Sequence, residues 1–407
     1  MSSTPLLRPA TNWPAVATLF IAGLAAAMQF SKIAPVMDAV AATFNLSLVE
    51  AGLSVSILGI VGIVFAISAG AIVGAIGLKR GILIALFGGA AIAALGAAAP
   101  NAALFLISRV AEGFAHLLIV VCAPALMAAH AAPQDRPVVL SLWGCFFGLG
   151  FAITSAVAPL ITAHFGWRGL MAAHAALLFL TGLANLYTLG RSGFHESRKP
   201  LPRAAALIQA HKDVYSSGAP LLTALTFCAY TLLFLAVLTF LGRFLIEVHR
   251  WSFESAGSFM SFVALITLTF TLGAGVLVRH SVPMLAGLSI AFAAIAVGGF
   301  GIFAIQPQGA LMVSLIILMM AGFGLVPGFV FANMPNVAPN AQRAALTYGA
   351  IAQFGNVGTF AGTPAFAFLY SHFGWTGGGM FVAGVALTGI GLAVMLRRAL
   401  GESNSNG

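Results

Sequence analysis

Hydrophobic residues occur along this chain in long blocks that few charged residues interrupt. Stretches without Asp, Glu, Lys or Arg include 51–78, 214–242, 280–342 and 344–396. A membrane-spanning helix needs about 20 consecutive apolar residues, so each stretch can hold at least one such helix. The last two must each hold two, because 306–309 and 374–377 have the composition of turns.

Breaks of this kind divide the chain into twelve helical spans and predict an all-α integral membrane protein. The first apolar segment is too long for the hydrophobic region of a signal peptide, so we expect it to be an uncleaved first span. The predicted spans are 13–42, 48–77, 81–99, 102–129, 138–162, 168–190, 217–246, 255–278, 282–304, 309–333, 344–370 and 377–396.

Composition agrees with this prediction. Of the 407 residues, 60% are hydrophobic and 7% are charged, whereas soluble domains average about 25% charged residues. The mean hydropathy is +1.04, which is too apolar for a water-soluble enzyme. Cys122, Cys145 and Cys228 all lie in apolar runs, which argues against a disulfide framework and against a zinc site.

The net charge of +9 reflects topology rather than nucleic-acid binding, which needs a basic soluble face. With the N-terminus in the cytoplasm, only Arg168 and Arg250 fall in outer loops, and positive residues are typical of cytoplasmic segments. We therefore expect both termini in the cytoplasm and a place in a bacterial cytoplasmic membrane. The cytoplasmic basic residues would be Arg8, Lys79, Arg80, Arg136, Arg191, Arg198, Lys199, Arg203, Lys212, Arg279, Arg343, Arg397 and Arg398.

An internal repeat divides the spans into two halves. The sequence His-Phe-Gly-Trp at 164–167 recurs 208 residues later at 372–375, in the same place relative to the spans. Parallel repeats of this kind are related by an axis along the membrane normal, with the substrate site between them near the midplane. The predicted parts are a six-helix bundle at 1–190, a basic linker at 191–216 with a surface helix near 204–211, and a second six-helix bundle at 217–407.

This arrangement resembles the major facilitator superfamily over essentially the whole chain. The loop at 70–80 reads Gly-x-x-x-Gly-x-x-Gly-x-Lys-Arg, similar to a family motif that usually has Asp where Gly74 stands. Span four carries Arg109-x-x-x-Gly113, similar to the family's Arg-x-x-x-Gly motif. The run from Glu112 to Trp143 is similar to the cyanate and nitroimidazole permease branch. The resemblance implies two bundles that expose a central site alternately to either side.

Ionisable groups inside the spans are candidates for function, because each costs about 2.5–3.5 kcal/mol on insertion and usually faces protein or water. Span four holds Arg109, Glu112 and His116 on one helical face. Glu112 would carry a proton as Arg109 moves toward or away from it, with His116 beside it. The alternative is a static buried pair that holds span four to its neighbours.

Span one offers Gln29 and Lys32 on one face for substrate binding, with Asp38 near its outer end as a further group for proton coupling. Lys32 could instead reach the outer interface if the span ends early. In span seven, the counterpart of span one, Arg243 would either bind substrate or form an interfacial salt bridge with Glu247.

Span eleven offers a polar stripe in an otherwise neutral second half. Gln353, Asn356 and Thr359 recur at three-residue spacing, and Tyr348 extends the stripe. Tyr348, Gln353 and Asn356 would bind substrate by hydrogen bonds, or the polar groups would hold helices together, as they do in bilayers.

No Walker loop, zinc-protease motif or nucleophile elbow occurs. The sequence therefore predicts a monomeric membrane protein that is not an enzyme and needs no metal or cofactor. Excess cations within the spans favour a secondary transporter of a small organic or inorganic anion, driven by protons. The alternative is a proton-coupled exporter of hydrophobic or cationic drugs, which Phe146, Phe147 and Phe151 would suit. The near-neutral second half argues against a channel.

Overall fold

The computed structural model of the protein describes residues 10–191, 200, 203–216, 218–338 and 341–405. Within these ranges all regular secondary structure is helical. Arg8, Arg198 and Lys199, which the sequence assigns to the cytoplasm, lie outside the described residues, as does part of the predicted linker.

Ten helical segments of the described chain are long and apolar enough to cross a membrane. Two of these are double, because α8 (Phe146–Gly190) and α15 (Ala341–Ser405) each bend at a glycine with non-helical backbone angles. Counting both halves of each gives the twelve spans predicted from the sequence. The helix predicted near 204–211 is also present, as α9 (Ala204–Tyr215).

The boundaries differ from the predicted ones by a few residues, and spans one and two are each broken in the middle. The remaining helices of the first half are α1 (Trp13–Ser31), η1 (Ala34–Val36), α2 (Met37–Phe44), α3 (Leu48–Ser56), α4 (Gly59–Ile76), α5 (Leu78–Ala97), α6 (Ala102–His130) and α7 (Arg136–Gly144). Those of the second half are α10 (Gly218–Glu247), α11 (Phe253–Arg279), α12 (Met284–Phe300), η2 (Gly301–Ile305), α13 (Gly309–Ala332) and α14 (Met334–Val337).

The bends in α8 and α15 fall on the repeated His-Phe-Gly-Trp sequence. Gly166 and Gly374 both have φ of 62°, with ψ of −171° and −158°. Only glycine adopts this backbone region readily, so the same residue makes the same turn in each half. The following tryptophans, Trp167 and Trp375, are both buried.

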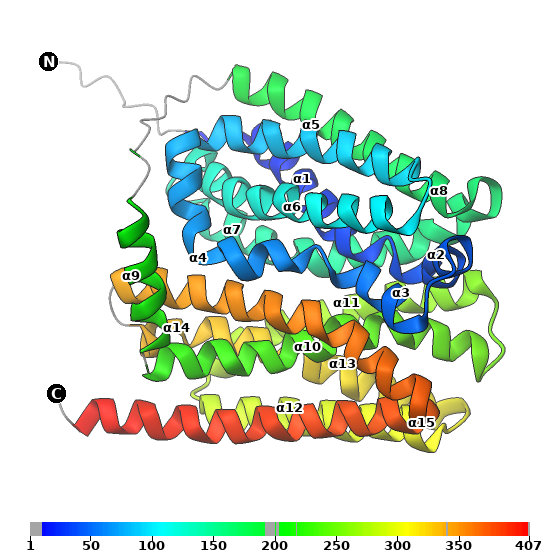
Figure 1. Ribbon diagram of the computed structural model, residues 1–407. Helices are drawn as coiled ribbons and strands as arrows, with labels where there is room; N and C mark the ends of the chain where they lie inside the picture. Colours follow the sequence, from blue (N-terminus) through cyan, green and yellow to red (C-terminus); the bar gives the residue numbers. More distant parts are fainter. Residues whose placement is uncertain (1–9, 192–199, 201–202, 217, 339–340, 406–407) are drawn as a thin grey trace, which may run out of the picture.

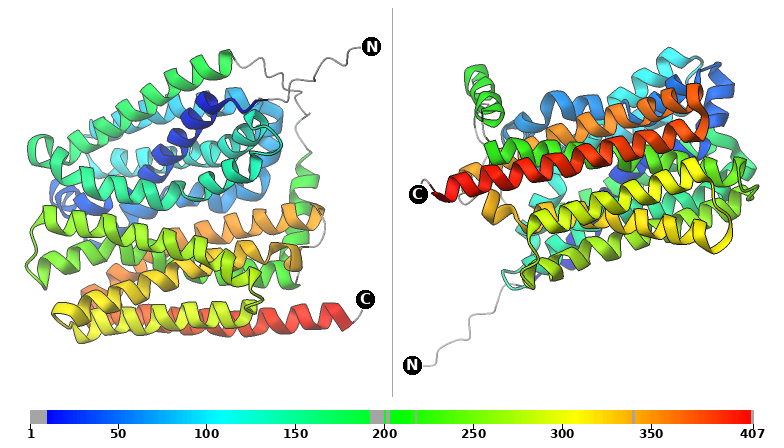
Figure 2. Two further views of the ribbon diagram at one scale, coloured as in Figure 1. Left: turned by 180° about the vertical axis from the view of Figure 1, so that it is seen from behind. Right: turned by 90° about the horizontal axis from the view of Figure 1, so that it is seen from below.

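The helices form two bundles that lie side by side (Figure 1). In the first, α1 and α5 pack on α6 and α8, and in the second α10 packs on α15 while α12 packs on α13 and α15. The same separation is visible from behind (Figure 2, left), whereas the view from below has the second bundle in front of the first. Across the interface, α3 and α4 pack on α15, and α8 packs on α11.

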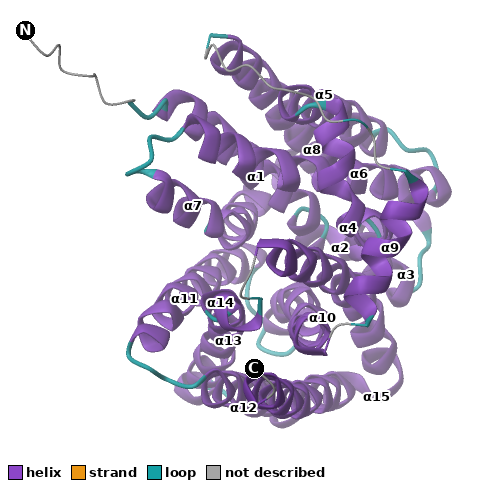
Figure 3. Ribbon diagram, turned by 90° about the vertical axis from the view of Figure 1, so that its left-hand side faces the viewer, coloured by secondary structure: helices purple, strands orange, loops and turns teal. Residues whose placement is uncertain are grey.

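The two ends of the bundles can be told apart. The start of α1, the end of α15 and α9 lie at one end, on the left in Figure 1, which we call the termini side. The opposite end, where α2 lies, is called the far side. Figure 3 looks at the molecule from the termini side, with the first bundle above and the second below. The sequence predicts that the termini side faces the cytoplasm.

Candidate functional site

The break in span one exposes backbone carbonyls in the interior of the first bundle. Helix α1 ends at Ser31, Lys32 is its C-cap, and a short turn of helix that contains Pro35 follows. The last four carbonyls of a helix have no partner within it. A lysine at this position is favoured, because the C-terminal end of a helix carries partial negative charge.

The break in span two lies beside the first one. Helix α3 ends at Ser56 and α4 begins at Gly59, so the last turn of α3 also has free carbonyls. Arg109 of α6 binds both breaks. Its Nε donates to the carbonyl oxygen of Ser54 at 3.1 Å, and one terminal nitrogen donates to that of Gln29 at 2.6 Å. The arginine thereby joins α6 to both broken helices.

Gly113 lets α6 come close enough for these bonds. A Cβ at this position would lie 2.3 Å from the carbonyl oxygen of Leu58, at the break in span two. In the Arg-x-x-x-Gly motif, the arginine and the glycine lie one helical turn apart. The arginine supplies the guanidinium group, and the glycine lets α6 come close enough to span two for the guanidinium group to bond there.

Glu112 accepts hydrogen bonds from two cations. Lys32 Nζ lies 2.6 Å from Glu112 Oε1, and Arg109 pairs with the other carboxylate oxygen. The three side chains are at most 1% exposed. With both cations and the carboxylate ionised, this group has a formal charge of plus one.

His174 of α8 is a fourth member that the sequence analysis missed. Its Nε2 lies 2.9 Å from the carbonyl oxygen of Ala25, which can only accept, so Nε2 carries the proton. In the neutral ring Nδ1 is then an acceptor, 3.0 Å from Lys32 Nζ. A histidine in an apolar span was the available signal. We call Lys32, Arg109, Glu112 and His174 the buried quartet.

Two residues predicted beside this group lie outside it. His116 Nδ1 is 3.0 Å from the carbonyl oxygen of Ala26, and its ring packs edge-on against Phe30. The Gln29 side chain is fully buried near Gly89, and its amide nitrogen and oxygen have no hydrogen-bond partner among the described residues. Neither side chain bonds to Lys32 or Glu112, so their predicted roles stay predictions.

Asp38 and Arg243 meet each other at the far side, across the two bundles. Arg243 donates to Asp38 Oδ1 at 3.0 Å and to Glu247 Oε1 at 2.6 Å, and Tyr370 donates to the other oxygen of Glu247 at 2.9 Å. The interfacial salt bridge with Glu247 is therefore present. The predicted roles of Asp38 in proton coupling and of Arg243 in substrate binding stay predictions.

A cavity of about 80 Å³ lies between the bundles beside this ion pair. Its lining includes Ser31, Phe151, Arg243 and Met260, from α1, α8, α10 and α11. Ligand pockets measure about 300–1,000 Å³, whereas this cavity has room for a few water molecules at about 30 Å³ each. The bundles are therefore nearly closed on each other here.

The polar stripe of span eleven makes contacts between helices. Gln353 donates to the carbonyl oxygen of Ile63 in α4 at 2.7 Å, and Tyr215 donates to its side-chain oxygen. Asn356 donates to Ala352 within its own helix. Tyr348 is 48% exposed. The contact of Gln353 with α4 is the kind expected if these groups hold helices together, and their substrate-binding role stays a prediction.

A multi-pass bundle of apolar helices, with an ion-paired group buried in its interior, is the architecture of an integral membrane protein. The chain belongs to the Major Facilitator Superfamily, whose family model matches residues 19–363, and this family points to a transporter rather than an enzyme. A search of curated protein sequences found no match. The family predicted from the repeat and the motifs is confirmed.

Solved structures of transporters share this fold. A bacterial homologue of the human lysosomal transporter Spinster, in an inward-facing and unoccupied conformation, has a TM-score of 0.72 at 14% identity, over 98% of this chain and 96% of that one. A D-xylose–proton symporter has a TM-score of 0.70 at 19% identity, over 93% and 97%. At these identities the likeness shows the fold alone.

Proposed function

We propose that the protein is a secondary active transporter of a small organic or inorganic anion and that the buried quartet couples this transport to protons. The observation that carries the proposal is the ratio of charges, with two cations for one carboxylate, in a fully buried group. A buried charge without a partner is costly. The surplus is removed either when an anion lies nearby or when Lys32 gives up its proton.

Because either a bound anion or the loss of the Lys32 proton removes the surplus positive charge, anion binding and proton binding are coupled. With an anion bound, Lys32 stays protonated and the charges balance. Without the anion, the quartet is neutral when Lys32 has lost its proton. An anion and a proton therefore bind favourably together, and binding linkage of this kind is reciprocal. Alternating access would then carry the pair across the membrane.

The position of Lys32 supports this coupling. Its neighbours Ser31 and Ala34 line the cavity between the bundles, although Lys32 itself is buried behind them. Lys32 is therefore next in sequence to a residue that lines the cavity between the bundles. A change at the interface can alter the surroundings of Lys32 without a long relay.

Uptake into proteoliposomes tests the proposal. We expect uptake of nitrate, which stays ionised, to rise with an inward proton gradient, and Lys32→Met and Glu112→Gln to abolish that rise. Arg398→Gln is the control, because Arg398 is an exposed cation in the last turns of α15. Uptake that ignores the proton gradient in the unmodified protein would contradict the coupling.

The second candidate is export of hydrophobic or cationic drugs. Aromatic residues of both bundles meet at the interface, where Phe147 and Phe151 lie 6.3 Å from Phe234. If this is the function, cells that lack the protein become sensitive to hydrophobic cations. If the anion proposal is correct, their sensitivity is unchanged.

Further proposals concern organisation and relatives. We propose bundles at 1–190 and 217–407 joined by the linker 191–216, in a chain that acts as a monomer.

We also propose that the termini side faces the cytoplasm of a bacterial cell. The excess of Lys and Arg in the segments predicted to be cytoplasmic supports this orientation. Within the superfamily, the run from Glu112 to Trp143 supports the cyanate and nitroimidazole permease branch.

A further inference from the structure

A row of aromatic side chains leads from the termini side of the second bundle into the interior. The rings of Tyr348 and Phe331 stack with centroids 6.2 Å apart, Phe331 lies 5.6 Å from Phe227, and Phe227 lies 5.2 Å from Tyr230. Tyr348 and Phe331 are 48% and 43% exposed, whereas Tyr230 is 7% exposed. The row therefore begins at accessible rings and ends at buried ones.

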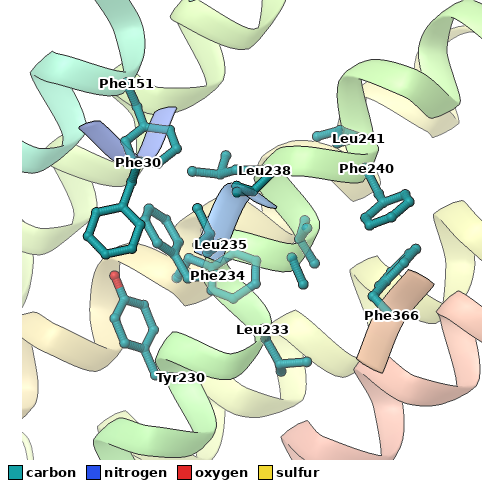
Figure 4. Packing of buried hydrophobic residues seen from close by; sticks show 14 of the residues in the cluster. Phe30, Phe151, Tyr230, Leu233, Phe234, Leu235, Leu238, Phe240, Leu241 and Phe366 are labelled. Atoms are coloured by element: carbon teal, nitrogen blue, oxygen red, sulfur yellow. The ribbon is translucent and has the colours of Figure 1, made fainter. Parts of the chain in front are cut away.

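At its inner end the row crosses from the second bundle to the first. Tyr230 stacks on Phe234 at 5.3 Å, and Phe234 lies 6.3 Å from Phe147, which in turn lies 6.0 Å from Phe30 of α1. Figure 4 shows the hydroxyl of Tyr230 directed toward the ring of Phe30, with Phe151 and Phe234 beside them. Both bundles thus contribute rings to one apolar surface at the centre of the molecule.

The side chain of Tyr230 is 7% exposed, and its hydroxyl makes no hydrogen bond to any described residue. The hydroxyl is not among the fully buried polar atoms that lack a partner, so it can be reached from the interior space, although a tyrosine hydroxyl in an apolar setting normally has a partner. An oxygen of a bound solute would satisfy it. The row therefore offers an apolar surface with one polar group at its inner end, which is typical of ligand sites.

The buried quartet determines which charge a solute at the inner end of the row should carry. Phe30 contacts His116 with ring centroids 4.9 Å apart, and Lys32 follows two residues after Phe30, with its surplus positive charge shared with Arg109 and Glu112. Aromatic faces alone attract cations. A full unit charge in a low-dielectric interior acts more strongly than a ring quadrupole, so the inner end of the row favours an anion.

We propose that the aromatic row is the surface that contacts the transported solute, and that the solute is an organic anion with a flat apolar body. Its body would lie against Tyr230, Phe234 and Phe147. Its charged group would lie at the Tyr230 hydroxyl, toward Phe30 and the buried quartet. This inference rests on the proposed anion transport and narrows the class of anion.

Three permanently ionised probes of related shape test the inference by uptake into proteoliposomes. Benzenesulfonate and methanesulfonate differ in the aromatic body, and benzyltrimethylammonium keeps the aromatic body but reverses the charge. We expect kcat/KM for benzenesulfonate to be at least tenfold above that for methanesulfonate, and uptake of the cation to stay at the level of empty liposomes.

Two variants and a matched control test whether the aromatic row is the source of the preference for benzenesulfonate. Phe234→Leu should lower kcat/KM for benzenesulfonate about tenfold and leave methanesulfonate nearly unchanged, and Tyr230→Phe should raise KM for benzenesulfonate several-fold. Phe292→Leu is the control, because Phe292 is an equally buried phenylalanine that packs against Gly389 away from the row. Benzenesulfonate should raise the Tm of the unmodified protein more than that of Tyr230→Phe, which reports binding independently of turnover.

The outcomes separate this inference from the function on which it rests. Equal uptake of both sulfonates, with Phe234→Leu no different from Phe292→Leu, overturns the aromatic surface and leaves anion transport standing. Uptake of nitrate but of neither sulfonate likewise overturns the aromatic surface and leaves anion transport standing. Selective uptake of benzyltrimethylammonium overturns both the inference and the proposed anion function, and so does a failure to take up any anion.

Discussion

Glu112 is the residue on which the interior of the first bundle depends electrostatically. Each of its carboxylate oxygens accepts from a different cation, Lys32 on one side and Arg109 on the other. Removing one partner of a buried ion pair costs about 3–5 kcal/mol, because the other charge is left uncompensated. Loss of the Glu112 carboxylate would leave the cations of Lys32 and Arg109 without a counter-charge. A neutral side chain at position 112 therefore cannot replace it.

The first prediction is that Glu112→Gln lowers the free energy of unfolding by about 3–5 kcal/mol, and that adding Lys32→Met recovers part of this loss by removing one cation. Thermal unfolding in detergent measures both. Glu254→Gln, at an exposed position in α11, should change stability by less than about 0.5 kcal/mol. A double variant that is no more stable than Glu112→Gln alone would show that the charges of Lys32 and Arg109 are not the cause.

His174 should contribute through its bond to Lys32. We expect His174→Ala to lower stability by about 1.5–3 kcal/mol, the value of a hydrogen bond to a charged group. His372→Ala is the matched control, because His372 lies exposed at the far-side turn of α15 and should change stability little. If both variants have the same Tm, the contact between His174 and Lys32 does not stabilise the quartet.

At the scale of elements, the two broken spans explain how a guanidinium group can be buried. The end of α1 supplies the carbonyl of Gln29, and the end of α3 supplies that of Ser54. Arginine is suited to this position because its fork of donors is rigid and always charged. The free carbonyls at the breaks accept hydrogen bonds from Arg109, which satisfies both the carbonyls and the buried guanidinium group.

Sequence reasoning predicted the spans but not these breaks. The length of an apolar block is a local property, which is why the twelve spans and the paired turns at Gly166 and Gly374 could be predicted. Pro35 signals the break in span one, whereas the break at Ile57 and Leu58 has only Gly59 beside it, and glycine occurs throughout the spans without breaking them. That break depends on which helices are neighbours, and so does the contact of His174 with Lys32.

Gly113 gives a direct test of the contact between α6 and the break in span two. An added Cβ would lie 2.3 Å from the carbonyl oxygen of Leu58, so we expect Gly113→Ala to destabilise the protein by about 1–3 kcal/mol through overpacking. Gly88→Ala is the control, because nothing lies within 4 Å of its added Cβ. It should be neutral or stabilising, since alanine favours helices. Equal Tm values for the two variants would contradict the close approach.

At the scale of the whole molecule, the two bundles are joined at the far side by the Asp38–Arg243 pair and along their length by the packing of α3 and α4 on α15 and of α8 on α11. In the alternating access that we propose, the ion pair would separate and the packed helices would provide the surfaces on which the bundles turn. Asp38 is 67% exposed, so solvent screens the pair. Its contribution is therefore at most about 1 kcal/mol.

We expect Asp38→Asn to shift the population toward conformations that are open at the far side by at most about fivefold, because 1 kcal/mol corresponds to that ratio. Spin-label distances between the far-side ends of α2 and α10 measure the shift. High salt should reproduce it in the unmodified protein and add nothing in the variant. A shift much larger than tenfold would mean that the pair is stronger than its exposure allows.

The central claim is that the surplus positive charge of the buried quartet makes an anion and a proton move together. Proteoliposomes that contain a pH-sensitive dye and have a clamped membrane voltage test it most directly, with an inward gradient of the permanently ionised anion that the protein transports best. We predict that anion entry acidifies the lumen, and that Lys32→Met and Glu112→Gln abolish this acidification. Anion entry at the normal rate with no change in internal pH would contradict the claim.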